Sequence, residues 1–291
     1  MKKPIVVCVC TAKGGVGKTT TTVALAEFLA SKGNKVLVID ADYQTNCTVA
    51  LIGNQNWEKL NKQKKTIVAL LEDAINEGSD GYIRQFDQET HVFREASNLA
   101  SSLEGRIDLI PSSPDLVFAK KNLYKAGKNS AFGSVNRLNF MEWGLRNNLL
   151  KYDFVLIDTH PDIDDILFAV LYVSDYYLMP VIPDAVSTYG IVTMRTSIGK
   201  FSHECRREIK QLGVLISMYR EINAHRLYFN TIKAQPGVKL FKTKIRLRAK
   251  VTEAMDYDAP VNTLKQKYGY EPNGIAEDYR NLATEVISRC Q

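Results

Sequence analysis

Short apolar runs alternate with longer amphipathic stretches along most of the chain. The first run, from Ile5 to Cys10, enters a glycine-rich turn. Next comes a stretch from Thr19 to Lys32, in which apolar side chains recur at helical spacing, and which ends at Gly33. A second apolar run covers Lys35 to Asp40. Since strand, helix and strand follow one another closely, the pattern predicts a βαβ unit with parallel strands.

The same alternation continues through the rest of the chain. Further strands are predicted at Ile107 to Ile110, Phe154 to Asp158, Tyr177 to Ile182 and Val214 to Met218. Helical patterns separate them near Ser134 to Leu150, Asp164 to Val173 and Val186 to Glu208. Residues from about 54 to 101 are more polar and are predicted to be a helical insertion. We therefore expect one α/β domain over residues 1–291, with a doubly wound, mostly parallel sheet and helices on both faces.

The composition is that of a globular protein without a membrane span. Hydrophobic residues make up 45% of the chain and charged residues 24%, which is enough apolar material for a full core. No apolar run approaches the roughly 20 residues that a membrane helix needs. The five cysteines have neither zinc-ligand spacing nor a C-x-x-C pair, and this suits a reducing compartment. We expect a cytoplasmic protein.

Positive charge is concentrated in one segment of the chain. Between Lys200 and Lys250 there are 13 lysines and arginines against 3 acidic residues, although the whole chain carries a net charge of only +6. This distribution favours a polyanionic partner. If the end of the segment is extended, four cations share one face at a spacing of two residues, which suits the phosphates of DNA. These are Lys242, Lys244, Arg246 and Arg248. The alternative is a solvated edge strand that its lysines protect from pairing.

A glycine-rich phosphate loop lies between the first strand and the first helix. It reads Lys13-Gly14-Gly15-Val16-Gly17-Lys18-Thr19-Thr20. The glycines let the backbone wrap ATP phosphates, Lys18 would reach their β and γ oxygens, and the Thr19 hydroxyl would ligate Mg²⁺. The usual pattern has glycine where this chain has Ala12, and here a lysine follows directly. Lys13 is better placed to reach a nucleotide across a subunit interface than to supplement Lys18 in its own subunit.

Acidic residues end two of the predicted strands. The second strand runs into Asp40-Ala41-Asp42-Tyr43-Gln44-Thr45-Asn46. A carboxylate at this position can orient the water that attacks the γ-phosphate or hold Mg²⁺ through its hydration shell. The alternative for Asp42 is a cap of the next helix. The apolar run that ends at Asp158 has the form of a Walker B strand, whose aspartate holds Mg²⁺ through water.

These motifs resemble the deviant Walker A family, which includes the ParA, MinD, arsenical-pump and nitrogenase iron-protein ATPases. The resemblance covers nearly the whole chain apart from the middle insertion. It implies an ATPase whose Lys13 contacts the nucleotide of a partner subunit, so that ATP favours a homodimer and ADP the monomer. The implied catalytic residues are Lys13, Lys18 and Asp42, and the implied metal-side residues are Thr19, Asp40 and Asp158. The residues implied to bind ATP are Lys13, Gly14, Gly15, Val16, Gly17, Lys18, Thr19 and Thr20.

Two positions depart from the family pattern. Proline is usual where this chain has Tyr43, and a proline pair usually follows the Walker B aspartate, where this chain has His160 and Pro161. The alternatives for His160 are a residue that senses phosphate or tunes a switch loop and a tolerated substitution in a turn, and we interpret it as the substitution. The acidic residues at 162, 164 and 165 are interpreted as charges at the start of a helix rather than a metal site.

The basic segment favours one branch of the family. Together with the residues up to Val261 it resembles the C-terminal stretch of ParA/Soj-type partition ATPases, where basic residues bind DNA without sequence preference. The resemblance implies a nucleoid-associated switch that moves a plasmid or chromosome, with a ParB-like centromere-binding partner that stimulates slow hydrolysis. The first strand starts by Pro4, so the N-terminal helix-turn-helix domain of larger plasmid ParA proteins is not expected.

Other branches fit the sequence less well. MinD-like proteins end in a basic amphipathic helix that docks on membranes, whereas Ala276 to Gln291 carries three acidic residues and only two arginines. Iron-protein reductases need paired cysteines, and Cys8 and Cys10 are expected to point to opposite faces of the first strand. No membrane contact is therefore expected. A MinD-like membrane-associated ATPase and a ParA-like positioner of a protein cargo remain the alternatives.

Overall fold

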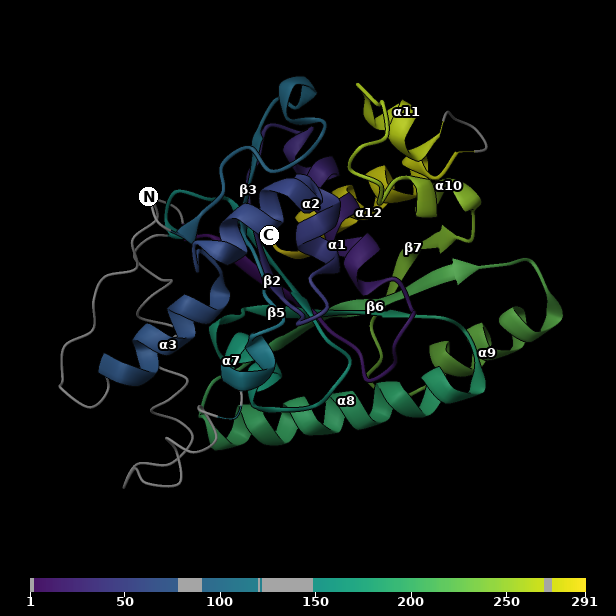
Figure 1. Ribbon diagram of the computed structural model, residues 1–291. Helices are drawn as coiled ribbons and strands as arrows, with labels where there is room; N and C mark the ends of the chain where they lie inside the picture. Colours follow the sequence, from purple (N-terminus) through teal and green to yellow (C-terminus); the bar gives the residue numbers. More distant parts are fainter. Residues whose placement is uncertain (1–2, 78–90, 120, 122–148, 270–273) are drawn as a thin grey trace.

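A parallel sheet forms the centre of the protein. The computed structural model describes residues 3–77, 91–119, 121, 149–269 and 274–291. Seven strands of this part pair in parallel in the order β3-β2-β4-β1-β5-β6-β7 (Figure 1). The strands are β1 (Ile5–Val9), β2 (Lys35–Ala41), β3 (Arg106–Ile110), β4 (Phe154–Thr159), β5 (Tyr176–Val181), β6 (Lys210–Tyr219) and β7 (Leu240–Arg246). Because β1 lies between β4 and β5, the turn after β1 opens at the middle of the sheet's carboxyl edge, where open α/β sheets bind ligands.

Helices cover both faces of this sheet. One face is covered by α1 (Lys18–Ala30), α2 (Asn46–Lys62) and α12 (Ala276–Arg289), with the short α10 (Ala249–Glu253) and α11 (Leu264–Tyr268). The other face is covered by α3 (Ile67–Glu77), α7 (Asp165–Val173), α8 (Ala185–Glu204) and α9 (Asn223–Lys233). A 3₁₀ helix, η1 (Ala100–Ser102), precedes β3. The predicted doubly wound α/β fold is confirmed.

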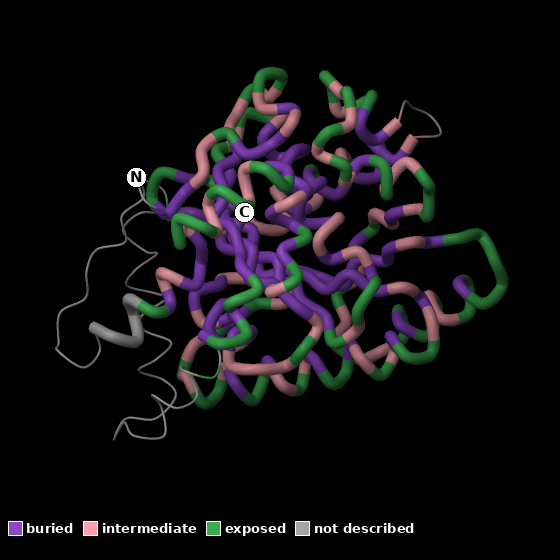
Figure 2. Tube along the Cα trace, in the orientation of Figure 1, coloured by how far each residue is buried: buried purple, intermediate pink, exposed green. Residues whose placement is uncertain are grey.

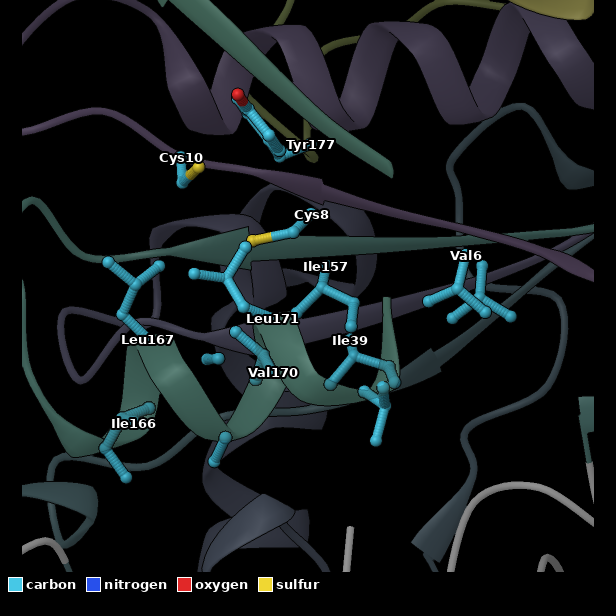
Figure 3. Close-up of a cluster of buried hydrophobic side chains, with 14 of the residues drawn as sticks. Val6, Cys8, Cys10, Ile39, Ile157, Ile166, Leu167, Val170, Leu171 and Tyr177 are labelled. Carbon is cyan, nitrogen blue, oxygen red and sulfur yellow. The ribbon is translucent and has the colours of Figure 1, made fainter. Parts of the chain in front are cut away.

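Two apolar layers, one on each face of the sheet, make up the core. Figure 2 shows the sheet as the buried centre of the molecule, with exposure along the outer sides of the helices. Side chains along β1 alternate between the layers: Val7 belongs to the layer that includes α1, whereas Cys8, and Cys10 just after the strand, belong to the layer that includes α7. Figure 3 draws the two cysteines with side chains of that second layer. The expectation that the two cysteines point to opposite faces was wrong, because residues two apart on a strand share a face. Burial on both faces explains the continuous apolar runs in the sequence.

The predicted boundaries differ from the structure in a few places. The helix α2 begins at Asn46, so the first helix of the supposed insertion belongs to the connection that follows β2. Residues 78–90 of that region lie outside the described residues, and so does nearly all of the helix predicted near Ser134 to Leu150. The insertion therefore stays a prediction. Among the described helices, none is long and apolar enough to cross a membrane.

A buried ion pair joins α1 to the C-terminal part of the fold. Glu27 of α1 has no exposed surface, and its Oε1 lies 2.7 Å from Nζ of Lys267, which is 1% exposed. The hydroxyls of Ser97 and Tyr268 also donate hydrogen bonds of 2.7 Å to the Glu27 carboxylate. Lys267 donates a further bond to the side chain of Asn98. A buried ion pair needs hydrogen-bond partners from the protein in place of water. Here several donors surround the carboxylate of Glu27.

Candidate nucleotide-binding site

The turn between β1 and α1 has the backbone shape of an anion-binding loop. Gly15 and Gly17 have φ angles of 71° and 84°, a conformation that glycine adopts at little cost. A Cβ added at Gly14 or Gly15 would meet no protein atom within 4 Å, so both positions border open space. The N-cap residue of α1 is Gly17, which has no side chain to cap the helix, so the first amide groups can bind an anion. From β6, Ser217 donates a 2.7 Å hydrogen bond to the carbonyl of Val16 and holds the loop against the sheet.

Lys18 lies at the end of this loop, at the first position of α1. Its side chain is largely buried, and the Nζ atom lies 3.4 Å from the carbonyl oxygen of Lys13. Burial lowers the pKa of Lys18, while the nearby charges of Asp158 and Asp42 act in the opposite direction. The ammonium group is thus placed among carboxylates at the end of the phosphate loop, where it can meet the anionic end of a nucleotide.

Thr19 and Asp158 form the oxygen-rich end of the site. The Thr19 hydroxyl donates a 2.7 Å hydrogen bond to one carboxylate oxygen of Asp158, and Thr22 donates to the other at 3.1 Å. Burial, with the neighbouring charge of Asp40, raises the pKa of Asp158 to about 8, although the Thr19 hydrogen bond opposes the shift. A hydroxyl beside a buried carboxylate supplies the oxygen ligands that Mg²⁺ prefers, so these residues fit the ion.

Asp40 is paired with Asp158 across β2 and β4 but has other contacts. Its carboxylate accepts hydrogen bonds from the amides of Asp42 and Thr48, at 3.0 and 2.9 Å, and from the Thr48 hydroxyl at 2.6 Å. Burial raises the pKa of Asp40 to about 7, against the effect of the Thr48 hydrogen bond. Asp40 thus ties the end of β2 to the start of α2. Its predicted metal-side role stays a prediction, although two adjacent buried carboxylates suit a divalent cation.

Asp42 lies on the turn that follows β2. It is 5% exposed, and its carboxylate accepts a 2.9 Å hydrogen bond from the amide of Gln44. The residue that precedes α2 is Thr45, so Asp42 does not cap that helix. The capping alternative is wrong because the chain makes a further tight turn, with Thr45 in the left-handed region, before the helix starts. Asp42 remains near enough to Lys18 for its charge to affect the pKa of that lysine.

Lys13 forms an ion pair within its own subunit. Its Nζ lies 2.5 Å from Oδ2 of Asp184, and each of the two side chains is about one-third exposed (31% and 34%). Asp184 also caps α8 by accepting a 2.7 Å hydrogen bond from the amide of Ser187. Burial opposes ionisation of Asp184, but the Lys13 and Ser187 bonds outweigh it and lower the pKa.

Sequence reasoning missed Asp184. The available signal was an aspartate between a predicted strand and a predicted helix, which indicates a helix cap and nothing more. Its contact with Lys13 follows from the pairing of β1 with β5, and strand order cannot be read from one sequence. Thr22 was missed for a similar reason, since its partner Asp158 is 136 positions away.

The four cations of the basic run lie in different surroundings, three of them in β7 and Arg248 just before α10. Lys242 and Arg248 are exposed. In contrast, Nζ of Lys244 lies 4.5 and 4.0 Å from the ring centroids of Tyr219 and Phe229. The guanidinium of Arg246 binds Asp278 of α12 and the carbonyl of Gly274.

The predicted single face of four cations is therefore not formed. An aspartate of α12 draws Arg246 to one side of the sheet, and aromatic rings of β6 and α9 draw Lys244 to the other. The strand itself lies at the end of the sheet in the described part of the chain. The position of β7 thus agrees with the alternative of a solvated edge strand. Of the four predicted cations, Lys242 and Arg248 are exposed.

Comparison with known proteins agrees with this geometry. A family model described as an AAA domain matches residues 4–211. The chromosome-partitioning ATPase Soj of Thermus thermophilus is 28% identical over 281 residues, which are 96% of this chain and 94% of that protein. The chromosome partitioning protein ParA of Caulobacter vibrioides is 27% identical over 286 residues, which are 98% of this chain and 94% of that protein. The chain belongs to the ParA/Soj family of P-loop ATPases.

A solved structure with a similar fold contains a bound nucleotide analogue. A putative plasmid partition protein from Borrelia burgdorferi, bound to AMPPNP, has a TM-score of 0.68 to this chain at 22% identity. The similarity covers 98% of this chain and 99% of the Borrelia protein. As a member of this family, the protein is a P-loop ATPase.

Proposed function

We propose that this ParA/Soj-family ATPase is a dimer switch that partitions a plasmid or chromosome. ATP holds two copies together, the dimer binds duplex DNA on the nucleoid without sequence preference, and hydrolysis releases it. A ParB-like centromere-binding partner stimulates an otherwise slow hydrolysis. The observation that carries this proposal is the different placement of two lysines: Lys18 is buried, whereas Lys13 is about one-third exposed and pairs with Asp184.

In this proposal the loop residues 14–20 bind ATP and Lys18 contacts the terminal phosphates. Thr19, Asp158 and Asp40 would hold Mg²⁺, which would supply positive charge to offset that of the phosphate oxygens. Asp42 orients the attacking water, because it is the carboxylate of the β2 turn that lies near Lys18 and is not used to cap a helix. The arrangement needs no covalent intermediate, since positioning and charge stabilisation suffice for phosphoryl transfer.

An apolar strip on α8 supports a second copy as the partner. Val186, Tyr189 and Val192 recur on one side of the helix and are 63%, 77% and 50% exposed. No charged residue occurs from Ala185 to Met194. Exposed apolar surface of this kind is typical of protein interfaces. The strip begins beside Asp184, which holds Lys13, so the lysine and the strip can meet the same partner.

The proposal is tested by retention of the protein on duplex DNA. The four arms are ATP, a slowly hydrolysed ATP analogue, ADP, and no nucleotide. We expect retention with the two triphosphates only, together with a dimer in sedimentation under the same conditions. A protein that stays monomeric with the analogue, or that binds DNA equally with ADP, would contradict the switch.

Lys13→Ala is expected to weaken the analogue-bound dimer by roughly tenfold to a hundredfold, because each subunit loses one charge-assisted hydrogen bond to the partner's nucleotide. Nucleotide binding to the monomer should stay within about threefold of wild type, since Lys18 is untouched. Sedimentation over a concentration series measures the first effect and a fluorescent ATP analogue the second. The matched control is Lys32→Ala, an exposed lysine beyond the far end of α1. Normal dimerisation of Lys13→Ala would show that this lysine does not act between subunits.

The DNA contact is predicted to use the two exposed cations of the basic run. Lys242→Ala combined with Arg248→Ala should reduce DNA affinity by at least about tenfold at moderate salt and lower the salt slope of the dimer by about four, because two phosphate contacts are lost in each of its two subunits. Fluorescence anisotropy over a salt series measures both quantities. The control pair is Lys59→Ala with Lys62→Ala, which removes two cations from α2. An unchanged slope in the first pair would place the DNA surface elsewhere.

A further inference from the structure

The two departures from the family pattern contact each other. Tyr43 follows Asp42 on the turn after β2, and His160 follows two residues after Asp158 on the turn after β4. The last paired residues of these parallel strands are Ala41 and Thr159, so the turns leave the sheet side by side. The ring centroids of Tyr43 and His160 lie 5.5 Å apart with an angle of 89° between the rings. This is an edge-to-face aromatic contact, which is a favourable geometry.

His160 is in turn attached to the helix that follows it. It is 2% exposed, and its Nε2 lies 2.8 Å from Oδ2 of Asp164. Since an ionised carboxylate can only accept, Nε2 carries the proton and donates a hydrogen bond to Asp164. The other oxygen of Asp164 caps α7 by accepting from the amides of Ile166 and Leu167. The imidazole is therefore fixed to the N-terminus of α7, and the interpretation of Asp164 as a helix-start charge is confirmed.

Simple filling of space does not account for the histidine. Its Nδ1 is buried, and it has no hydrogen-bond partner among the residues that the structure describes. Burying a polar nitrogen in this way is unfavourable, whereas the proline that the family pattern has at this position carries no such atom. The hydrogen bond from Nε2 to Asp164 and the ring contact with Tyr43 offset this unfavourable burial of Nδ1.

We propose that Tyr43 and His160 are positioning residues for ATP hydrolysis. The pair couples the turn that carries Asp42 to the turn that carries Asp158, and through Asp164 to α7. It performs the task that rigid prolines would perform, which is to hold a flexible turn in one conformation. The carboxylate of Asp42 accepts a hydrogen bond from the amide of Gln44 and the amide of Asp42 donates to Asp40, so both bonds lie within this stretch of the chain. The ring contact of the neighbouring Tyr43 with His160 adds a link to the turn that follows β4. This inference rests on the proposed role of Asp42 in orienting water.

The test measures kcat and KM separately for Tyr43→Ala and His160→Ala. Each variant is expected to lower kcat by about tenfold, because misplacing a catalytic group by a fraction of an ångström slows the reaction. The KM for ATP and the affinity for a slowly hydrolysed analogue should change less than about twofold, since neither residue belongs to the phosphate loop. The kcat of the double variant should be about the same as that of either single variant, because the two residues act as one contact.

Conservative variants separate positioning from folding. Tyr43→Phe keeps the ring edge and should retain kcat within about twofold, and His160→Gln keeps a donor to Asp164 and should recover part of the loss. Replacing both residues with proline should restore kcat further than either proline alone. Effects of the two alanine variants that multiply in the double variant would overturn the pairing, as would a loss confined to KM.

Asp42→Ala serves as the reference that keeps the two proposals apart. If Asp42→Ala hydrolyses ATP normally, the proposed role of that carboxylate is wrong. If Asp42→Ala is inactive while Tyr43→Ala and His160→Ala keep full kcat, only the positioning role is wrong.

Discussion

Replacing Asp42 with alanine is expected to slow ATP hydrolysis by at least about a hundredfold, which is the usual loss when a side chain that handles the attacking water is removed. Nucleotide affinity should be nearly unchanged, because the phosphate loop and the Thr19 and Asp158 pair remain intact. The dimer formed with ATP should therefore persist, and DNA retention with ATP should outlast that of wild type. Single-turnover hydrolysis and the lifetime of the DNA complex are the two measurements.

Asp42→Asn is the matched variant for this experiment. Asparagine keeps an acceptor for the amide of Gln44, so the turn retains its hydrogen bond, but the negative charge is gone. Equal losses in the alanine and asparagine variants indicate that the charge acts on water. Recovery of hydrolysis in Asp42→Asn would instead mean that the residue only shapes its own turn, and the proposed mechanism would need another carboxylate.

Glu27→Ala is expected to destabilise the protein by about 3–5 kcal/mol, because it leaves the buried ammonium of Lys267 without its partner. The hydroxyls of Ser97 and Tyr268 lose their acceptor as well. Urea unfolding measures the change, and most of the loss should appear in the midpoint rather than in the slope. Such a loss is a large part of the stability of a typical domain.

A double substitution shows whether charge is the cause. Glu27→Gln with Lys267→Met removes both charges and keeps similar volumes, so it should cost much less than Glu27→Ala alone. The surface control is Glu221→Ala, which breaks an exposed pair with Arg226 and should change stability by less than about 1 kcal/mol. A double variant as unstable as the single one would mean that hydrogen-bond geometry, and not an unpaired charge, dominates this region.

Local motifs were predictable because their chemistry is contiguous in the chain. The phosphate loop, the Asp40 to Asn46 turn and the Walker B strand each lie within a few residues, and the order of strands and helices makes their context recognisable. Strands that are buried on both faces give strong apolar runs, so β1, β2 and β4 were located closely. The doubly wound fold follows from that alternation.

Contacts between distant residues were not predictable. Lys13 and Asp184 are 171 positions apart, and Glu27 and Lys267 are 240 apart, so no spacing in the sequence connects them. The prediction that the four cations of the basic run share one face was wrong for a different reason. Alternation along a strand gives the direction in which a side chain leaves the backbone, but long side chains bend toward the nearest partner, as Arg246 does toward Asp278. The start of α2 was misplaced because the left-handed residue Thr45 carries no sequence signal for such a turn.

The ion pair between Lys13 and Asp184 has a consequence for assembly. If Lys13 serves the partner's nucleotide, as proposed, each subunit must first give up a contact that it already has. The net gain is then only a difference between two charge-assisted hydrogen bonds, and Asp184 keeps its bond from Ser187 throughout. ADP lacks the γ-phosphate, so it offers Lys13 fewer phosphate oxygens to replace the contact with Asp184. In each monomer, Asp184 thus competes with the partner's nucleotide for Lys13. This competition weakens dimerisation in general and increases the difference in dimer stability between the ATP and ADP states.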